Sequence, residues 1–449
     1  MALCENAGRC GGCFYQEIPY EEQLKMKETE VYELLRPAIE GDFCFEPIIP
    51  SPLEYAYRNK MEFSFGDQQR DGPLTLGLHQ KKSFFNILNA DDCRIAHPDF
   101  GKILRVTREY FTRLGIGYFH KKSHIGYLRH LLIRRAVKTG EILIDLVSST
   151  QTVEFVADGL WDRICAGEEA MRKAGRGLRE EMLEALLEEN ILKGYVERLR
   201  RLEEEGELAG RIVGILHTRN DSPADAIRDD GTEILYGEGF FYEELLGLRF
   251  KISPFSFFQT NTLGAEKLYD KVREYAGTEF EKKPVIYDLY SGTGTITQLM
   301  SAVAERAIGV EIVEEAVLAA RENAERNGIA NCSFLVGDVL KVIQEGGQLL
   351  RADGTAEDAP RPDLIILDPP RDGIHPKALK RILDYGADTL IYIACKPKSL
   401  ARDLLPMQAA GYRVKKVCCV DMFPQTNNVE AVALLSHEAP NSHINVKIG

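Results

Sequence analysis

Two chemically reactive side chains stand in the C-terminal part of the chain. Cys395 ends the apolar run TLIYIAC, which predicts a strand, and Glu430 closes the stretch that begins at Phe423. A thiolate is a nucleophile and a carboxylate is a base, so together they could bond covalently to a substrate and then remove a proton from it. A lone cysteine at a strand end is more often a small buried residue, by roughly two to one. The following Pro397 and the neighbouring strand end at Asp368 reverse those odds.

A glycine turn lies upstream of these residues. Asp288 to Thr295, with the sequence DLYSGTGT, predicts a strand that runs through Gly292 and Gly294 into a helix that starts near Thr295. Such a turn lets the backbone approach a ligand closely. A dinucleotide-binding loop would carry a third glycine where Thr297 stands, and a turn with two glycines is alone a weak signal.

Two acids follow at the ends of the next two predicted strands. Glu311 stands about 20 residues after the turn, where a carboxylate reaches ribose hydroxyls, and Asp338 could accept from an adenine amino group. Either acid alone has about even odds of merely capping the next helix. Together they favour an adenosine ligand without a pyrophosphate, which is S-adenosylmethionine (SAM).

A cysteine and a glutamate beside a methyl donor suggest methylation of carbon 5 of a uracil. That carbon is a poor nucleophile until a thiolate adds at carbon 6, after which a base must remove its proton. Asp368 to Arg371 resembles the motif of enzymes that methylate base amino groups, but Arg371 replaces their stacking aromatic residue. An amino-group target is therefore disfavoured. A free cysteine is only a few per cent ionised at neutral pH, and Lys396 could help to ionise Cys395.

Three cysteines stand near the start of the chain, at Cys4, Cys10 and Cys13, among glycines that let several thiolates face one centre. From spacing alone, a [4Fe–4S] cluster and a zinc site are about equally favoured. The chain has no predicted signal peptide or membrane span, so we expect a cytoplasmic protein whose thiols stay reduced.

The elements that must position these groups predict an α/β protein. With 449 residues, two or three domains are expected. We place a cysteine segment and helix at 1–50, a central α/β RNA-binding domain at 51–246, and a Rossmann-like methyltransferase domain with a doubly wound sheet at 247–449. Residues 176–207 predict an amphipathic helical insertion, with Leu178, Met182 and Leu186 in one row, which we interpret as a solvated arm.

The net charge of −13 means that any RNA contact must come from a local basic patch. Between Lys102 and Lys138 a single acid, Glu109, stands among many cations and aromatic residues. Cations follow phosphates and aromatic rings stack unpaired bases, so the segment predicts an RNA-binding surface. The basic residues are Arg105, Arg108, Arg113, Lys121, Lys122, Arg129, Arg134 and Arg135, and the aromatic ones are Tyr110, Phe111, Tyr118, Phe119 and Tyr127.

These motifs, with Ser256 to Asn261, resemble the RNA uracil-C5 methyltransferases, which make 5-methyluridine in 23S rRNA and tRNA with SAM. The resemblance implies that Cys395 is the nucleophile and Glu430 the base. It further implies that the cofactor and base pocket is lined by Gln259, Tyr290, Glu311 and Asp368. Family members that act on rRNA often bind a [4Fe–4S] cluster, and the matching ligands here are Cys4, Cys10, Cys13 and Cys93. The resemblance places iron–sulfur ahead of zinc.

The sequence departs from the family at three positions. Lys396 replaces a usual Asn, Asn428 a common His, and Ser291 a frequent Cys. The N-terminal β-barrel of many members is also missing from this sequence. We expect a monomer that methylates 23S rRNA. The alternatives are a tRNA uracil-C5 methyltransferase and a non-catalytic RNA-binding or ribosome-assembly factor.

Overall fold

The computed structural model describes residues 3–151, 180–339, 348–350, 356–358 and 360–437. The chain forms two compact units: unit 1 comprises Met1–Glu17, Tyr55–Glu244 and Lys251–Phe255, and unit 2 comprises Ile18–Glu54, Leu245–Phe250 and Ser256–Gly449. Residues 1–50, expected to be one segment, are therefore divided. The cysteines belong to unit 1, whereas the helix that follows them packs in unit 2.

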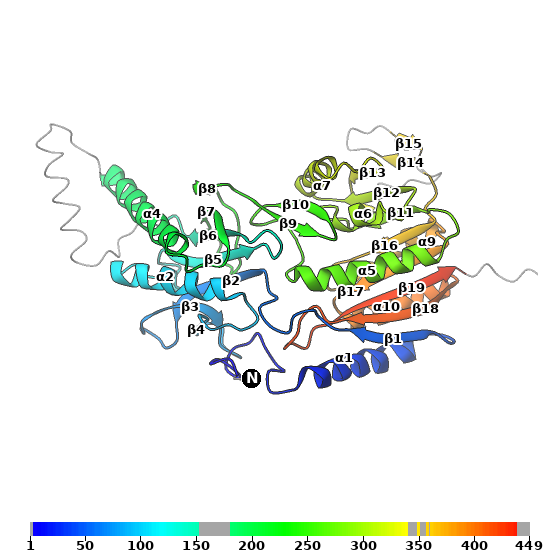
Figure 1. The fold of residues 1–449 in the computed structure, drawn as a ribbon, viewed down its shortest axis with the longest axis horizontal. Helices are drawn as coiled ribbons and strands as arrows, with labels where there is room; N and C mark the ends of the chain where they lie inside the picture. Colours follow the sequence, from blue (N-terminus) through cyan, green and yellow to red (C-terminus); the bar gives the residue numbers. More distant parts are fainter. Residues whose placement is uncertain (1–2, 152–179, 340–347, 351–355, 359, 438–449) are drawn as a thin grey trace, which may run out of the picture. The chain divides into compact units, whose positions relative to one another are not determined.

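Unit 2 is built on an eight-stranded sheet (Figure 1). All neighbouring pairs are parallel except those of β19, which is antiparallel to β17 and β18. The predicted α/β fold is confirmed, with a mixed sheet. In spatial order the strands are β1 (Cys44–Ile49), β18 (Tyr412–Val420), β19 (Glu430–His437), β17 (Thr389–Ala394), β16 (Leu364–Leu367), β11 (Val285–Leu289), β12 (Arg306–Glu311) and β13 (Cys332–Val336).

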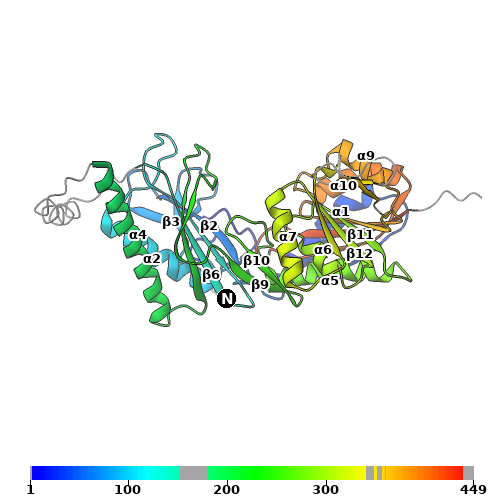
Figure 2. The ribbon, with the colours of Figure 1, turned by 90° about the horizontal axis from the view of Figure 1, so that it is seen from above.

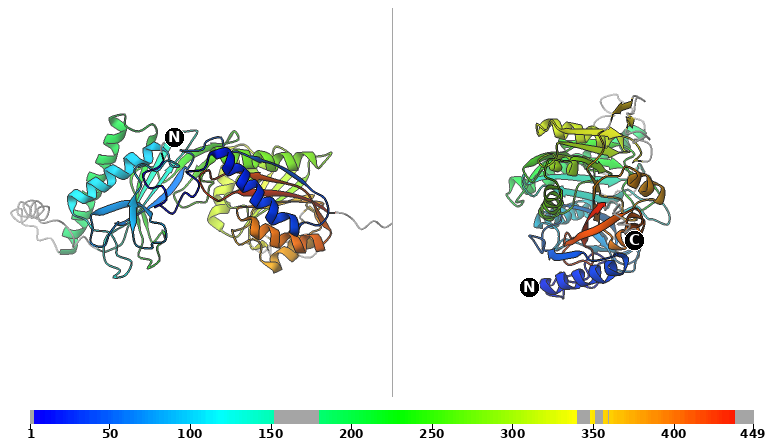
Figure 3. Two further views of the ribbon diagram at one scale, coloured as in Figure 1. Left: turned by 90° about the horizontal axis from the view of Figure 1, so that it is seen from below. Right: turned by 90° about the vertical axis from the view of Figure 1, so that its right-hand side faces the viewer.

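Helices cover both faces of this sheet (Figure 2). Helices α1 (Tyr20–Leu35), α9 (Pro376–Asp384) and α10 (Pro397–Ala409) lie on one face, and the views in Figure 3 show α1 beside α10. Helices α5 (Thr262–Thr278), α6 (Thr295–Met300) and α7 (Glu314–Arg326) lie on the other. Successive strand residues point to opposite faces, so Leu335 joins the core under α1, α9 and α10 while Phe334 packs against α7. A 3-10 turn, η1 (Arg36–Ala38), follows α1, and β14 (Gln348–Leu350) and β15 (Ala356–Asp358) pair separately.

Unit 1 contains a seven-stranded sheet with α2 (Pro98–Leu114) and α4 (Glu180–Glu204) packed side by side on its core. Its pairs are antiparallel except β6 with β7. A two-stranded pair, β9 (Phe241–Leu245) and β10 (Leu248–Ile252), follows along the chain. In order, the sheet contains β4 (Ile87–Asn89), β3 (Leu74–His79), β2 (Lys60–Asp67), β5 (Leu128–Arg135), β6 (Glu141–Ser148), β7 (Arg211–Arg219) and β8 (Thr232–Gly237).

Helix α4 corrects the interpretation of residues 176–207 as a solvated arm. Tyr195 and Leu199 are fully buried in the core of unit 1, and the Tyr195 hydroxyl bonds to that of Thr107 on α2 at 3.0 Å. Leu178 lies outside the described residues, as do the side chains of Met182 and Leu186. The helix is therefore an integral part of the domain from about Ile191 onward.

Within the described residues, no helix has the length and apolarity needed to cross a bilayer.

The burial of α4 predicts a large effect of truncating Leu199. Leu199→Ala should lower the free energy of unfolding of unit 1 by about 2–5 kcal/mol, because it removes a fully buried side chain and leaves a cavity. Glu189→Ala on the same helix removes an exposed side chain and should change it by less than about 0.5 kcal/mol. Denaturant titration measures both, and equal stability of the two variants would restore the solvated-arm interpretation.

Candidate functional site

The carboxyl ends of the parallel strands of unit 2 gather most of the predicted site residues at one edge of the sheet. Asp368 follows β16 directly, Cys395 follows β17, and the glycine turn follows β11. The neighbouring strands are in register, with Leu289 opposite Leu367 and Leu367 opposite Tyr392. The residues that follow these strands therefore lie side by side. Crevices at this edge are where open α/β sheets bind ligands.

Glu430 reaches the same edge because β19 runs in the opposite direction. It is the first residue of β19, and the antiparallel ladder pairs Ala394 with Ala431. Cys395 and Glu430 are the residues next to this last pair, and the charge of Glu430 helps to raise the pKa of the Cys395 thiol. The structure thus brings the predicted nucleophile and base together, although they are far apart in sequence.

Burial dominates the electrostatics of this group. Glu430 is 4% exposed, and burial followed by the charge of Asp368 raises its pKa to about 8. Burial and then Asp288 raise the pKa of Asp368 to about 7. The Cys395 thiol, which is partly exposed, has its pKa raised to about 11 by burial, then by Glu430 and Asp368. Burial therefore shifts the equilibrium of all three groups towards the protonated form.

The suggestion that Lys396 ionises Cys395 is not supported by the geometry. The Lys396 ammonium binds the Asp372 carboxylate at 3.1 Å instead. The cation that lowers the pKa of Cys395 is Arg371. The sequence analysis interprets Arg371 only as a replacement for an aromatic residue, so it does not predict the electrostatic effect of Arg371 on the thiol.

Tyr269 on α5 is a site residue that the sequence did not reveal. It is 2% exposed, hydrogen-bonds to Gln259, and has its pKa raised far above its usual value by burial and by the charges of Asp368, Glu430 and Asp288. It therefore faces the carboxylates directly. A tyrosine within an amphipathic helix looks like ordinary core, so only its proximity to these acids identifies it.

The glycine turn is held in a strained conformation. Tyr290 has a φ of +73°, which is rare for a residue with a side chain, and the amides of Tyr290 and Ser291 both donate to the Val310 carbonyl at 3.1 Å. A side chain at Gly294, where φ is +72°, would collide with the ring of Phe334. Gly292, with φ of +52°, faces open space instead. Thr295 begins α6 directly after the turn.

Glu311 links this turn to the next strand. One carboxylate oxygen accepts from the Gly292 amide at 2.9 Å, and the other accepts from the amides of Ile312 and Val313 at 2.8 and 3.0 Å. A carboxylate has about four acceptor positions, so one remains for a ligand hydroxyl. The amides that Glu311 binds precede α7, whose N-cap, Val313, makes no side-chain cap bond, so the capping role that the sequence left open is not observed for Glu311.

Asp288 and Ser291 show that this edge is built to receive a polar ligand. Asp288 is fully buried, and one of its oxygens accepts from the Thr297 hydroxyl at 2.6 Å. Its other oxygen and the Ser291 hydroxyl are buried without a hydrogen-bond partner. Such unsatisfied atoms are costly unless a ligand or water occupies the site. Burial raises the pKa of Tyr290 to about 12, and the nearby Asp338 carboxylate contributes to this rise.

A buried polar clamp from α1 holds the loop that precedes Glu430. The Lys27 ammonium binds Asp421 at 2.7 Å and the Phe423 carbonyl at 3.1 Å. Gln23 accepts from the Gln425 amide at 3.0 Å and donates to the Gln425 side chain at the same distance. The sequence analysis did not identify these residues. Gln23 and Lys27 belong, at four-residue spacing, to the same buried row of α1 as Val31 and Leu35. On the other side, Asn261 caps α5 and donates to the Met422 carbonyl at 2.9 Å.

In unit 1, the four predicted cluster cysteines line one small cavity. Burial, followed by the charges of Cys13, Cys4 and Cys10, raises the pKa of Cys93 to about 12. Leu78, Leu88 and Ala90 of the β3–β4 region complete the apolar part of the wall. Among the residues that the structure describes, no group of three or more histidines, cysteines or acids has the arrangement of a single-ion site.

The basic segment 102–138 contributes mainly to internal structure, which corrects its interpretation as a continuous RNA-binding surface. Arg129 and Arg134 are 5% and 2% exposed and donate to backbone carbonyls. Arg108 forms two bonds of 2.6 Å with Asp91, and Arg135 binds Asp99 at 3.0 Å. Phe111, Phe119 and Tyr127 are buried as well. Charge density in a sequence does not show which cations are already paired, and here most are.

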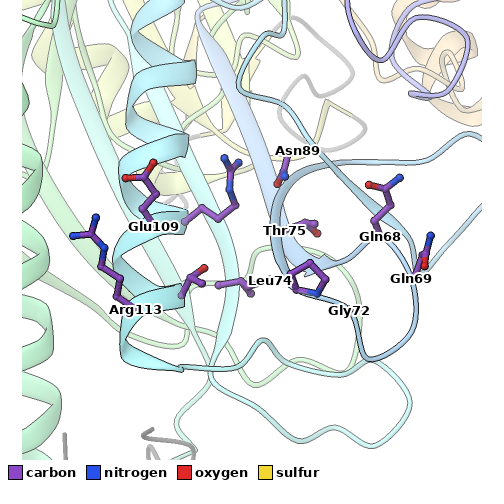
Figure 4. Close-up of a pocket in the computed structure, with 11 residues that line it drawn as sticks. Gln68, Gln69, Gly72, Leu74, Thr75, Asn89, Glu109 and Arg113 are labelled. Atoms are coloured by element: carbon purple, nitrogen blue, oxygen red, sulfur yellow. The ribbon is translucent and has the colours of Figure 1, made fainter. Parts of the chain in front are cut away.

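A surface hollow of about 660 Å³ lies elsewhere in unit 1 (Figure 4). Glu109 and Arg113 of α2 line one side, and the turn that carries Gln68, Gln69 and Gly72 lines the other. It contains none of the predicted site residues.

Comparisons with known proteins found a matching family model and similar relatives. Residues 232–438 match the family model for tRNA (Uracil-5-)-methyltransferase. An uncharacterized RNA methyltransferase of Clostridium tetani is 42% identical over 96% of this chain and 83% of its own length. Another, of Clostridium acetobutylicum, is 44% identical over 97% and 84%.

A solved structure shows a similar fold over nearly the whole chain. It is the Pyrococcus abyssi tRNA (uracil-54, C5)-methyltransferase in complex with S-adenosyl-L-homocysteine. The TM-score is 0.67, with 24% identity over 95% of this chain and 86% of that one. At this identity the likeness concerns the fold.

The raised pKa of Glu430 predicts how stability depends on pH. Its pKa is above the usual value of 4.5, so the folded protein binds the extra proton, and the free energy of unfolding should fall as pH rises from about 4.5 to about 8. Glu430→Gln cannot ionise, so its stability relative to the native protein should increase over that window. Denaturant titrations at pH 5 and pH 8.5 measure this difference.

Glu314→Gln is the matched control because Glu314 is exposed on α7. Its stability relative to the native protein should not vary over the window. A Glu430→Gln variant that tracks the native protein at both pH values would contradict the burial of this carboxylate in a desolvated site.

Proposed function

Since this chain belongs to the RNA uracil-5 methyltransferase family and uses SAM, we propose that it forms 5-methyluridine in 23S rRNA as a monomer, with Cys395 and Glu430 as catalytic residues. The observation that supports the assignment of these two residues is that both adjoin the last pair of the β17–β19 ladder, Ala394 with Ala431, and that the charge of Glu430 acts on the Cys395 thiol. The family establishes the reaction class, whereas the choice of rRNA rests on the three N-terminal cysteines and Cys93.

In the proposed mechanism the thiolate of Cys395 adds to carbon 6 of the uracil, which makes carbon 5 nucleophilic. SAM supplies the methyl group that carbon 5 accepts. Glu430 then takes the proton from carbon 5, and the thiolate leaves as the ring regains its double bond. Both protein groups must first lose their own protons, because their pKa values in the ligand-free protein are about 11 and about 8.

The residues present fit a cationic methyl donor. Asp288, Asp368 and Glu430 bring three carboxyl groups to the edge, all with raised pKa values. A positive sulfonium nearby would favour their charged forms and would lower the pKa of Cys395 as well. The free oxygen of Asp288 and the hydroxyl of Ser291 offer polar contacts, while Glu311 has one acceptor position for a ribose hydroxyl. Gln259, Tyr290, Gly292, Gly294, Thr295 and Asp338 are proposed as further cofactor contacts.

We also propose that Cys4, Cys10, Cys13 and Cys93 hold a [4Fe–4S] cluster. They surround one cavity, and four thiolates are the usual ligand set of such a cluster. Zinc, the alternative, needs four sulfurs about 2.3 Å from one point. The cluster takes no part in methyl transfer, which moves no single electrons.

Replacing the nucleophile tests the mechanism. Cys395→Ala should lose 5-methyluridine formation altogether, because no thiolate can then activate carbon 5. Glu430→Gln should still form the bond to carbon 6 but release it slowly, so that a protein–RNA adduct accumulates. Denaturing gel electrophoresis detects the adduct, and RNA containing 5-fluorouridine should trap it with the native protein. Cys44→Ala, which removes an exposed cysteine on β1, is the control and should methylate normally.

Methylation by Cys395→Ala at the native rate would refute the nucleophile. The choice between 23S rRNA and tRNA is tested separately, by mapping 5-methyluridine in cells with and without the gene. A missing methyl group in tRNA alone would favour the tRNA alternative.

Metal content tests the cluster. Protein purified without oxygen should contain about four irons and four sulfides per chain, and Cys10→Ser should lose most of both. Cys44→Ser should leave the content unchanged, since Cys44 belongs to unit 2. One zinc per chain and no sulfide would overturn the assignment in favour of the zinc alternative.

A further inference from the structure

The loop between β3 and β4 presents two phenylalanine rings to solvent. Phe84 is 82% exposed and Phe85 is 50% exposed. A third ring, Phe14 of the N-terminal segment, is also 50% exposed. Large apolar side chains that remain this exposed, in a group, indicate a surface that binds something.

Lysines surround these rings. The Lys122 ammonium lies 4.8 Å from the centre of the Phe85 ring, and that of Lys81 lies 5.0 Å from the centre of the Phe14 ring. Lys82 in the same loop is exposed. A nearby acid, Asp225, is bound by Lys121 at 2.5 Å and by His79 at 3.0 Å. Burial raises the pKa of this carboxyl, but the two partners outweigh that effect and hold the pKa below its usual value. The loop surface is therefore positive in a chain of net charge −13.

The loop is fixed in place before any partner arrives. The Ser83 hydroxyl accepts from the amides of Phe85 and Asn86 at 3.3 and 3.1 Å, and the Lys121 ammonium donates to the Phe84 carbonyl at 3.0 Å. A surface that is already ordered loses little conformational entropy on binding.

The cysteine segment anchors the same loop. The Lys81 amide donates to the Arg9 carbonyl at 2.7 Å, and the Gly11 amide donates to the His79 carbonyl at 3.2 Å. The backbones of Cys10 and Gln80 pair in an isolated antiparallel β-bridge. The cavity lined by the four cysteines is closed on another side by Leu78 and Leu88, which belong to the strands that carry the loop. The cysteines therefore form the base of the hairpin whose tip carries Phe84 and Phe85.

We propose that Phe84 and Phe85, with Lys81, Lys82 and Lys122, form a stacking platform for unpaired bases of the substrate RNA. Aromatic rings stack bases of any sequence while lysines pair with the phosphates between them, which is how single strands are bound. The proposal rests on the RNA substrate of the proposed function. It assigns RNA contact to a surface that shares only Lys122 with the 102–138 segment.

The hollow in Figure 4 is a weaker candidate for this role. Its Arg108 is neutralised by two bonds to Asp91, and Glu109 stands beside Arg113. It presents no exposed aromatic ring, since its apolar lining consists of Pro73 and Leu74. Arg113 therefore serves as the control cation in the experiment.

The test measures binding of a fluorescein-labelled single-stranded RNA by anisotropy as a function of salt. Phe84→Ala and Phe85→Ala should each raise Kd by about tenfold without changing the salt dependence, because stacking releases no counterions. Phe84→Trp should bind like the native protein, whereas Phe84→Leu should bind like Phe84→Ala. Lys122→Gln should reduce the slope of log Kd against log salt by about 0.7.

Two controls fix the meaning of these results. Ile234→Ala removes an exposed apolar side chain of the same unit, and Arg113→Ala removes an exposed cation; both should bind like the native protein. Native affinity in Phe84→Ala and Phe85→Ala would overturn the platform, as would equal binding by the Leu and Trp variants, which would show that no aromatic ring is required.

The outcome is independent of catalysis. If the native protein binds RNA through this loop but forms no 5-methyluridine, the proposed function fails and the platform stands. If the native protein methylates RNA while the loop variants bind normally, the platform fails and the proposed function stands.

Discussion

One antiparallel strand in an otherwise parallel sheet is the constraint on which the site depends. Parallel strands deliver only their carboxyl ends to the ligand edge, which accounts for Asp368 and Cys395. An antiparallel strand delivers its amino end, so β19 begins at that edge with Glu430. β18 ends at the same edge, where Val420 pairs with Glu430, and residues 421–429 form the loop that joins the two strands there. The Lys27–Asp421 pair, Gln23 and Asn261 hold this loop from two helices.

This arrangement creates an electrostatic cost that the ligands must offset. Ionising Glu430, Asp368 or Asp288 in so desolvated a group is unfavourable, and their raised pKa values measure that penalty. In the proposed mechanism Cys395 and Glu430 act in their ionised forms, which burial disfavours. A cationic donor nearby would shift this balance towards the ionised forms.

The sequence predicted those parts of the site that are encoded locally. Strand ends, the glycine turn and the acids after β12 and β13 follow from short patterns, because the residue after a parallel strand lies at the ligand edge wherever the strand falls in the sheet. Contacts between distant segments leave no such pattern. Lys27 and Asp421 are 394 positions apart, and nothing near either residue indicates that a buried lysine is neutralised by the other. The basic segment failed for the same reason, since the partners of Arg108 and Arg135 lie outside it at Asp91 and Asp99.

The cysteines pose a different question, because the chemistry proposed for unit 2 has no use for an electron carrier. The hydrogen bonds of unit 1 suggest what they contribute. Residues 9–11 pair with the end of β3 and the start of its loop, so whatever fixes the cysteines also fixes the base of that loop. Two phenylalanine rings facing water on an ordered loop cost stability unless a partner covers them, and ordering them in advance strengthens the binding of that partner. A cluster in this position would act on RNA affinity through the rigidity of a hairpin.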